Sequence, residues 1–584
     1  MATTCAAVLA CGGGDAQEPA PGERGRGAAD PLPIADDSLA SAVSEYADRL
    51  GRVGFSGVIL VERAGRILHA RGEGLDDREA GRPFTTATVW SMGSITKPFT
   101  ATAILRLVEQ GRLSLSDSLG RFVEDLPADR AGITIEHLLT HHGGLAEAQE
   151  GDFTPVDRDR IEEIARETDL RFDPGSRYAY SNLGYSLLGV VLEKVTGESY
   201  ESHLRRELLV PPGLYETGYL APRWDPSRLA VGYQRGDRFG TLIERMPPDG
   251  PYWVLRANGG LHTTAFDMLR WVRASLRGEG FGPTVAAWLT EPRVERTEGS
   301  SVALGWAIDD GRPGARSVHH DGSNGIFWAD VRFFPARDLV IIVASNVAEL
   351  TAQPVASTIE RLAFGEPVTL PPRLDPIALD DADREALTGS WRFEDEGRAD
   401  VAWTGELLEL AVEGQDLIDR FLTLEEGEAE RFRELNRRAR AALEAAVAGD
   451  HSAVAEALGL EEGPDPVAGL IESAGRDLGR FRDFEVLGTA PVWYATPYAT
   501  WVRLRFEGGT TIRRLHWTGD GSYYGLGGQV YRAPLTLPCI GSGARECTGF
   551  HLVLPVRSPT LTAAADGVEV EIGEVTLRGR PDSD

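Results

Sequence analysis

The residues with the clearest capacity for chemistry are Ser94 and Lys97, which stand three positions apart. The chain has 584 residues and 60 basic side chains, of which only Lys97 and Lys194 are lysines. An arginine stays protonated in a protein, whereas a lysine amine can lose its proton when it is desolvated. A lysine beside a serine, in a chain that otherwise uses arginine, therefore indicates a proton-transfer role that arginine cannot fill. The pair predicts a nucleophile, Ser94, next to a base, Lys97.

The second lysine predicts no chemistry. Lys194 lies in the stretch Leu192-Glu193-Lys194-Val195, inside a helical pattern. We interpret it as a residue of a solvated helix face.

A helix must begin at the serine–lysine motif for the two side chains to meet. Pro98 falls in the first turn, where backbone amides lack helical partners in any case, and apolar residues recur until a stop at Gly111. Residues i and i+3 share one helix face, so Lys97 Nζ can reach Ser94 Oγ. The helix N-terminus also favours a developing negative charge.

Strand patterns stand at both ends of the first 365 residues. Runs at 55–61 and 67–70 flank a turn and predict a β-hairpin. Three further strands are predicted at 302–308, 327–334 and 339–344, and the polar turn at 335–338 predicts antiparallel pairing of the last two. The segments between these groups are helical, as in residues 185–195. We therefore expect a sheet closed by both ends of this unit.

A different pattern follows the proline-rich connection at 366–372. Short strands are predicted at 388–412, an Ala/Glu/Arg-rich helical stretch at 428–459, and strands again at 484–557. This order predicts a helix laid on an antiparallel meander.

Charge and hydropathy exclude several function classes. The formal net charge is -29, which argues against nucleic acid, because phosphate binding needs clustered Lys and Arg. No run of 18 apolar residues occurs, so no membrane-spanning helix is expected. The expected partners are small molecules or peptides.

The cysteines leave two questions open. The apolar run Cys5 to Gly12 resembles the tail of a bacterial lipoprotein signal, so either Cys11 is lipidated and attaches the protein to a membrane, or the similarity is accidental. Residues 12–33 are rich in Gly, Pro, Ala and charge, which predicts a flexible tether. Cys539 and Cys547 form a small disulfide loop if the protein is exported, or are two free thiols.

Five motifs, taken together and in order, resemble a known family. They are Ser94-Ile95-Thr96-Lys97, Ile133 to His141, Phe172-Asp173-Pro174-Gly175 with Tyr180-Ser181-Asn182, Gly259-Gly260-Leu261, and His320-Asp321-Gly322. This order resembles the beta-lactamase-related serine hydrolases, in the branch of class C beta-lactamases, D-alanyl-D-alanine carboxypeptidases, D-aminopeptidases and serine esterases. The resemblance covers about residues 38–365.

The resemblance implies catalytic roles at four positions. Ser94 would be the acylated nucleophile and Lys97 its base. Tyr180 would relay protons to the leaving group, and Asn182 would hold the substrate amide or its equivalent.

The third motif departs from the usual Lys-Thr-Gly. Here it is His320-Asp321-Gly322, and these positions with Ser323 would bind substrate, the amides of Ser94 and Ser323 forming the oxyanion hole. A neutral His320 replaces a permanent cation, which argues against anionic substrates. Asp321 would further repel anions. Arg316 is a candidate for the missing charge.

The resemblance also implies a fold and a division of the chain. We expect an α/β (α+β) beta-lactamase/transpeptidase-like domain, with an antiparallel sheet flanked by helices plus a helical subdomain, followed by a C-terminal α+β region. The expected divisions are 1–33 (signal-like segment and tether), 34–366 (hydrolase domain), 367–387 (linker) and 388–584 (C-terminal modules). We expect an exported protein.

Three functions remain open at this point. The first is a serine hydrolase that cleaves an ester or amide through an acyl-enzyme on Ser94. The second is a D-amino-acid-specific peptidase on peptidoglycan fragments, and the third a catalytically silent binder of cell-wall peptides. His137, His141 and His142 include the i, i+4 spacing of a metal pair, but no third ligand follows, so neither a metal nor a cofactor is expected.

Overall fold

The computed structural model describes residues 36–582 with internal gaps. The gaps are residues 146–150, 235–236, 298, 312–314, 349, 369, 372–378, 395, 404–407, 461–464, 493–497, 531–534, 544–545, 550–558 and 573. The tether and Cys11 lie outside the described residues. None of the described helices combines the length and the apolar sequence that crossing a bilayer requires.

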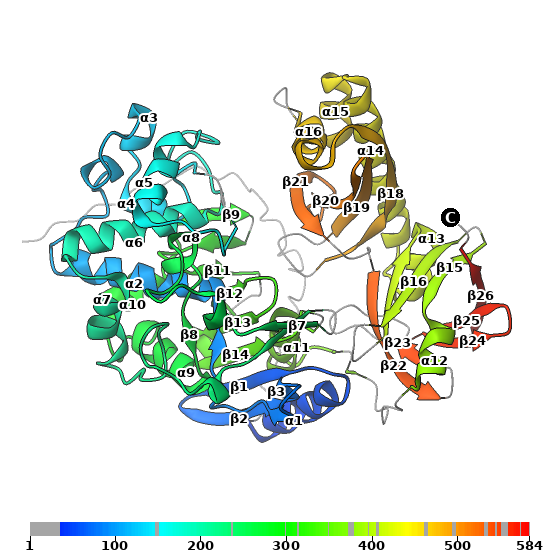
Figure 1. Cartoon of the computed structure of the whole chain (residues 1–584), viewed down its shortest axis with the longest axis horizontal. Coiled ribbons are helices and arrows are strands. Elements are labelled where there is room, and N and C mark those ends of the chain that lie inside the picture. The colour runs from blue at the N-terminus through cyan, green and yellow to red at the C-terminus, as the bar shows by residue number, and fades with distance from the viewer. Residues whose placement is uncertain are drawn as a thin grey trace, which may run out of the picture.

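An eight-stranded antiparallel sheet forms the centre of the first half of the chain (Figure 1). In spatial order its strands are β2 (Arg66–Glu73), β1 (Gly57–Arg63), β14 (Leu339–Ser345), β13 (Trp328–Phe334), β12 (Ser317–Ser323), β11 (Ala307–Asp309), β10 (Ser300–Val302) and β9 (Val294–Thr297). Strand β1 pairs with both its hairpin partner β2 and the distant β14. The prediction that both ends of this unit close the sheet is confirmed.

Two layers of helices cover the sheet, because the central strands carry apolar side chains on both faces. Ile59 of β1 and Ile341 of β14 pack with α1 (Asp36–Arg52) and α11 (Ala352–Ala363). Leu60 and Ile342 face the opposite way and join the larger core.

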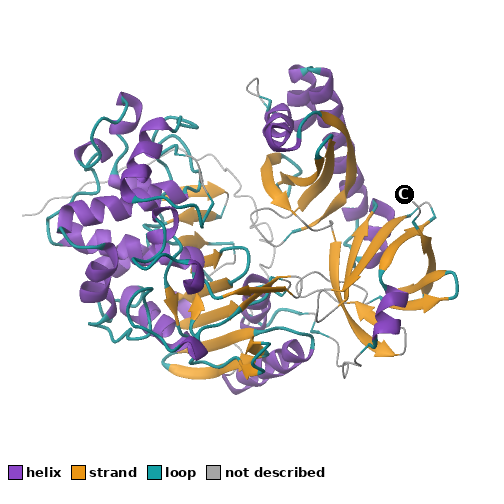
Figure 2. Cartoon of the chain, viewed as in Figure 1, coloured by secondary structure: helices purple, strands orange, loops and turns teal. Residues whose placement is uncertain are grey.

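The helices of the larger core gather on one side of the sheet in Figure 2. They are α2 (Thr96–Glu109), α3 (Ala128–Ala131), α4 (Ile135–Leu139), α5 (Arg158–Glu167), α6 (Asn182–Thr196), α7 (Tyr200–Leu204), α8 (Trp253–Arg256), α9 (Ala265–Ser275) and α10 (Gly282–Thr290). Three short strand pairs, β3 (Leu75–Asp77) with β4 (Arg82–Pro83), β5 (Trp90–Ser91) with β8 (His262–Thr263), and β6 (Gly232–Gln234) with β7 (Asp237–Gly240), complete this half.

The second half contains the predicted antiparallel meander with a helix packed on it and, in addition, a closed barrel. A closed antiparallel barrel consists of β15 (Gly389–Phe393), β16 (Gly397–Trp403), β17 (Leu408–Glu413), β22 (Leu535–Gly543), β23 (Glu546–Gly549), β24 (Thr560–Ala564), β25 (Gly567–Ile572) and β26 (Val575–Pro581). A four-stranded sheet, β18 (Phe481–Pro491), β19 (Tyr498–Phe506), β20 (Gly509–Trp517) and β21 (Tyr523–Val530), is inserted between β17 and β22. Leu408 therefore pairs with the distant Cys539.

The helices of this half are α12 (Asp381–Leu387), α13 (Gln415–Phe421), α14 (Glu428–Ala448), α15 (His451–Leu458) and α16 (Pro466–Leu478). The predicted helical stretch at 428–459 is confirmed but divided, because Gly449 adopts a φ of 75° and ends α14. Leu435 and Leu443 of α14 pack on Val502 and Trp517 of the four-stranded sheet. Cys539 of β22 is disulfide-bonded, which excludes two free thiols.

Candidate active site

Ser94 and Lys97 meet at the start of α2. A 3-10 turn, Gly93–Ile95, leads directly into the helix at Thr96. Lys97 Nζ lies 3.0 Å from Ser94 Oγ and is hydrogen-bonded to it. The Lys97 side chain is fully buried, whereas Ser94 is partly accessible. The sequence therefore predicted both the helix start and the contact.

A second acceptor fixes the lysine. Lys97 Nζ donates to the carbonyl oxygen of Asn258 at 3.0 Å. The Asn258 side chain donates in turn to Ser186 Oγ (2.9 Å) and, more weakly, to the carbonyl of Asn182 (3.4 Å). Sequence reasoning did not single out Asn258, although it directly precedes the Gly259-Gly260-Leu261 motif. Asn258 contacts Lys97 through its backbone carbonyl. Every residue type has this group, so the sequence gives no signal for the contact.

Tyr180 and Asn182 lie beside the lysine at the start of α6. Lys97 Nζ is 4.8 Å from the centre of the Tyr180 ring. Ser181 caps α6, its Oγ accepting the amide of Gly184 at 3.0 Å, so Asn182 is the first helical residue. Within the described residues, Asn182 Oδ1 is buried and has no hydrogen-bond partner. An unsatisfied buried acceptor at this place suits a substrate N–H group.

Strand β12 lies close to Ser94 because Gly93 and Gly322, which carry no Cβ, stand where the turn and the strand meet. Gly93 has a φ of 53°, and a Cβ there would lie 2.6 Å from the amide nitrogen of Ser323. A Cβ on Gly322 would lie 1.9 Å from Met92 O and 3.0 Å from the amide nitrogen of Ser94. The two amides assigned to the oxyanion hole thus flank one tight contact between the turn and the strand.

His320 lies on β12 and is neutral near pH 7. Its Nδ1 contacts the carbonyl of Asp321 at 2.6 Å, and because a carbonyl only accepts, Nδ1 carries the proton. Burial lowers the pKa of His320 to about 4; the charge of Lys97 acts in the same direction, whereas Asp321 opposes it. The third motif therefore presents an uncharged ring, as the sequence predicted.

The neighbours of His320 along β12 face the other side of the sheet. Asp321 Oδ2 accepts a hydrogen bond from Gln353 of α11 at 3.3 Å. The expectation that Asp321 repels anionic substrates in the pocket is therefore wrong, because side chains alternate between the faces of a strand. Arg316 binds both oxygens of Asp310 at 2.7 and 2.8 Å, so that guanidinium is engaged outside the serine site.

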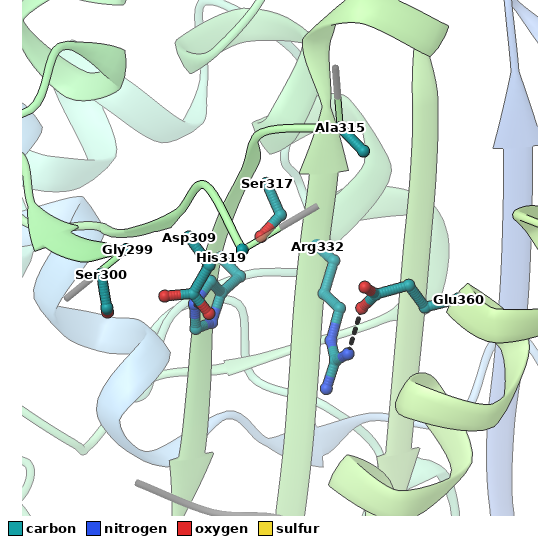
Figure 3. Close-up of a pocket in the computed structure, with 9 residues that line it drawn as sticks. Gly299, Ser300, Asp309, Ala315, Ser317, His319, Arg332 and Glu360 are labelled. Carbon is teal, nitrogen blue, oxygen red and sulfur yellow. Dashed lines mark hydrogen bonds and ion pairs between the residues drawn. The ribbon is translucent and has the colours of Figure 1, made fainter. Parts of the chain in front are cut away.

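A cavity of about 370 Å³ opens on this second face (Figure 3). His319 Nε2 lies 2.9 Å from Asp309 Oδ2 on one side of it. On the other side Arg332 pairs with Glu360 of α11. The cavity is lined by mutually paired charges and does not include Ser94, so it is separate from the serine site.

The three histidines that were considered as metal ligands form hydrogen bonds to protein groups instead. The His137 side chain completes a capping box with Thr134. His142 Nδ1 donates to the carbonyl of Thr140 at 2.9 Å, and His141 Nδ1 accepts from the amide of Ser181 at 3.0 Å. Over the described ranges, no cluster of three or more His, Cys, Asp or Glu is placed to hold a metal ion.

Comparison with known proteins adds an independent finding. A family model described as Beta-lactamase matches residues 39–363. Penicillin-binding protein 4* of Bacillus subtilis (strain 168) is 27% identical over 390 residues, which cover 63% of this chain and 86% of that protein. Esterase EstB of Burkholderia gladioli is 32% identical over 338 residues, covering 50% of this chain and 86% of the esterase.

Solved structures share the fold. The octameric penicillin-binding protein homologue from Pyrococcus abyssi superposes with a TM-score of 0.51 at 18% identity, covering 93% of this chain and all of the other. EstCE1, a hydrolase with promiscuous acyltransferase activity, gives a TM-score of 0.51 at 23% identity, covering 57% of this chain and all of the other. At these identities the likeness concerns the fold alone.

Proposed function

The chain belongs to the beta-lactamase family of serine hydrolases, and from this premise we propose that it cleaves an ester or amide through an acyl-enzyme on Ser94. The observation that carries the proposal is the 3.0 Å contact between Lys97 Nζ and Ser94 Oγ on a fully buried lysine. A buried amine loses the water that stabilises its charged form. A neutral amine at this distance can take the serine proton.

The reaction proceeds in two halves. Ser94 Oγ passes its proton to neutral Lys97 and attacks the substrate carbonyl, and the amides of Ser94 and Ser323 hold the resulting oxyanion. The proton then moves through Tyr180 to the leaving group, which departs and leaves the acyl group on Ser94. In the second half, a water molecule gives a proton to the same base and attacks the acyl carbonyl. The bond between Ser94 Oγ and the acyl carbon breaks, the acid leaves, and the base returns the proton to Ser94 Oγ. Asn182 Oδ1, buried without a partner among the described residues, would accept an N–H of the substrate.

The neutral third motif favours an uncharged group at that end of the substrate. A lysine there would bind a carboxylate, whereas the buried His320 ring stays neutral near pH 7. We therefore favour the ester-cleaving hydrolase over a peptidase for D-alanyl carboxy termini. The similarity to a protein named esterase supports this choice, while the similarity to a penicillin-binding protein keeps the D-amino-acid-specific peptidase as the second candidate.

A substrate panel tests the proposal. Wild type and Ser94→Ala are compared on p-nitrophenyl esters, a D-alanyl-D-alanine peptide and a penicillin. We expect ester turnover that disappears in Ser94→Ala. Turnover of the peptide instead would establish the second candidate. A folded wild type that turns over none of the three would favour a silent binding protein.

We further propose that the protein is exported and acts at the cell envelope, with residues 34–366 as the catalytic domain and 388–584 as separate C-terminal modules. The similarity to a penicillin-binding protein and the lipoprotein-like run around Cys11 support this placement. The mass of the N-terminal fragment from native membranes distinguishes a lipidated Cys11 from an unmodified one.

A further inference from the structure

His141 occupies a strained backbone position immediately after α4. Its φ is 59°, in the left-handed region, although it is not a glycine. Only 7% of the residue is exposed. A non-glycine residue in this region costs on the order of 1 to 3 kcal/mol and persists only where surrounding contacts enforce it. The contacts of His141 therefore indicate what the position is for.

Those contacts hold the peptide groups on both sides of Tyr180. The amide of Ala179 donates to the His141 carbonyl at 2.9 Å, and the amide of Ser181 donates to His141 Nδ1 at 3.0 Å. The His141 ring lies against the Tyr180 ring, with centres 4.4 Å apart and planes tilted by 30°. One residue thus fixes the backbone before Tyr180, the backbone after it and the plane of its ring.

The imidazole can do this only in its neutral form. Nδ1 accepts a hydrogen bond, so the single ring proton sits on Nε2. Burial holds the pKa of His141 well below its usual 6.5, and the nearby Lys97, His320, Arg296 and His142 lower it further. The ring therefore keeps its acceptor at neutral pH.

We propose that His141 is a positioning residue that holds Tyr180 against Lys97 for proton transfer, a role that rests on the function proposed above. The Tyr180 ring centre is 4.8 Å from Lys97 Nζ on one side and 4.4 Å from the His141 ring on the other. Without the imidazole, the Tyr180 segment loses one of its two backbone bonds to His141 and the surface that orients its ring. A displacement of a catalytic group by about 1 Å can cost about 100-fold in rate.

Two substitutions separate this role from simple backbone strain. Glycine relieves the left-handed conformation but removes both the acceptor and the ring. Asparagine also tolerates the left-handed region, and its Oδ1 can accept from the Ser181 amide. His142→Asn serves as the matched control, because its ring bonds to Thr140 O and not to the Tyr180 segment.

The experiment measures cleavage of an alkyl ester by the full chain, because an alkoxide leaving group needs a proton, and records kcat and KM separately; fluorophosphonate labelling counts the reactive serines. For His141→Gly we expect complete labelling with kcat, the rate constant of turnover, lowered about 100-fold and KM within about 2-fold. His141→Asn should recover about 10-fold of that loss, and His142→Asn should match wild type. A purely structural role would lower the labelled fraction and leave the rate constant unchanged.

Hydrogen exchange of the Ser181 amide, measured on peptides from the same proteins, gives a readout that does not depend on activity. We expect protection in wild type and His141→Asn and its loss in His141→Gly. If wild type is not labelled, the proposed function fails, yet exchange still decides whether His141 holds the segment. Unchanged exchange in His141→Gly, or an unchanged rate constant in its folded fraction, would overturn the inference.

Discussion

The two lysines of this chain lie in regions that treat the same side chain in opposite ways. At the start of α2, Lys97 is fully buried and donates to two uncharged oxygens, Ser94 Oγ and Asn258 O. Near the end of α6, Lys194 is 29% exposed and lies 2.6 Å from the Glu162 carboxylate. It also donates to the carbonyl of Phe122 at 2.8 Å. Lys194 is exposed, which confirms that it belongs to a solvated helix face, and its role is structural.

Only the position of Lys97 requires a lysine. A carboxylate and a carbonyl accept from any cation, so an arginine can serve in the Lys194 region. Taking a proton from a serine requires an amine that exists in its neutral form. Lys97 is fully buried, and burial disfavours the charged form of an amine.

Lys97→Arg should have the largest effect on turnover. We expect the rate of ester cleavage to fall about 100 to 10,000 fold, the range for loss of a general base. Steady-state kinetics with thermal melting of the same sample measures it. A variant that is folded and retains full turnover would show that Lys97 is not the base.

Gly322→Ala tests the strand that faces the lysine. The new Cβ would lie 1.9 Å from Met92 O, so β12 must shift and carry the Ser323 amide away from Ser94. We expect a loss of about 100 to 1,000 fold in turnover, as for one oxyanion-hole donor. Gly132→Ala is the control, since a Cβ there meets no described atom within 4 Å. Equal activity in the two variants would contradict the tight contact.

The pKa of His320 gives an electrostatic test of the difference between the two lysines. Burial is the largest cause that lowers the pKa of His320 to about 4, and the charge of Lys97 adds to it. Lys97→Met should therefore raise that pKa part of the way towards 6.5, whereas Lys194→Met should leave it unchanged. NMR titration of the histidine ring measures both, and equal shifts in the two variants would contradict this difference.

The same shift has a consequence for stability. Because the folded state holds the pKa of His320 below its unfolded value, the unfolded chain binds the proton first as the pH falls. The contribution of neutral, buried His320 to the free energy of unfolding is thus fully present above about pH 6.5. It is lost as the pH falls towards about 4. Urea unfolding of wild type at pH 7 and pH 5 should show the lower stability at pH 5.

Lys194→Arg should have the smallest effect. Arginine can keep the bond to Glu162, an ion pair at a partly exposed site, so we expect a change in the free energy of unfolding of about 0.5 kcal/mol or less and unchanged turnover. Urea unfolding and the ester assay measure these quantities. A large loss of turnover would remove the distinction between the two lysines.

The sequence predicted most of what is local in this molecule. The helix start at Ser94, the β1–β2 hairpin and the end of α6 at Gly197 follow from spacing and turn residues. The contact between Lys97 and Ser94 follows from helix geometry alone. These features depend on neighbours within a few residues.

Features that depend on distant partners could not be predicted. Asn258 meets Lys97 across 161 positions through its carbonyl, which is common to all residue types. The face of the sheet on which the Asp321 side chain lies depends on the register of β12 against β13. The sequence did not predict the barrel of the C-terminal half beside the meander, because strand patterns do not specify that β17 pairs with β22 across the inserted unit.

Ser94 is the proposed nucleophile, and the intact mass of the protein after exposure to a fluorophosphonate shows whether this serine forms a covalent adduct. We predict one adduct per wild-type chain, mapped by peptide mass to the peptide that contains Ser94, and none on Ser94→Ala. A parallel exposure to a penicillin reports whether the site also accepts an anionic amide. A folded wild type that gains no adduct, or an adduct that persists in Ser94→Ala, would contradict the account.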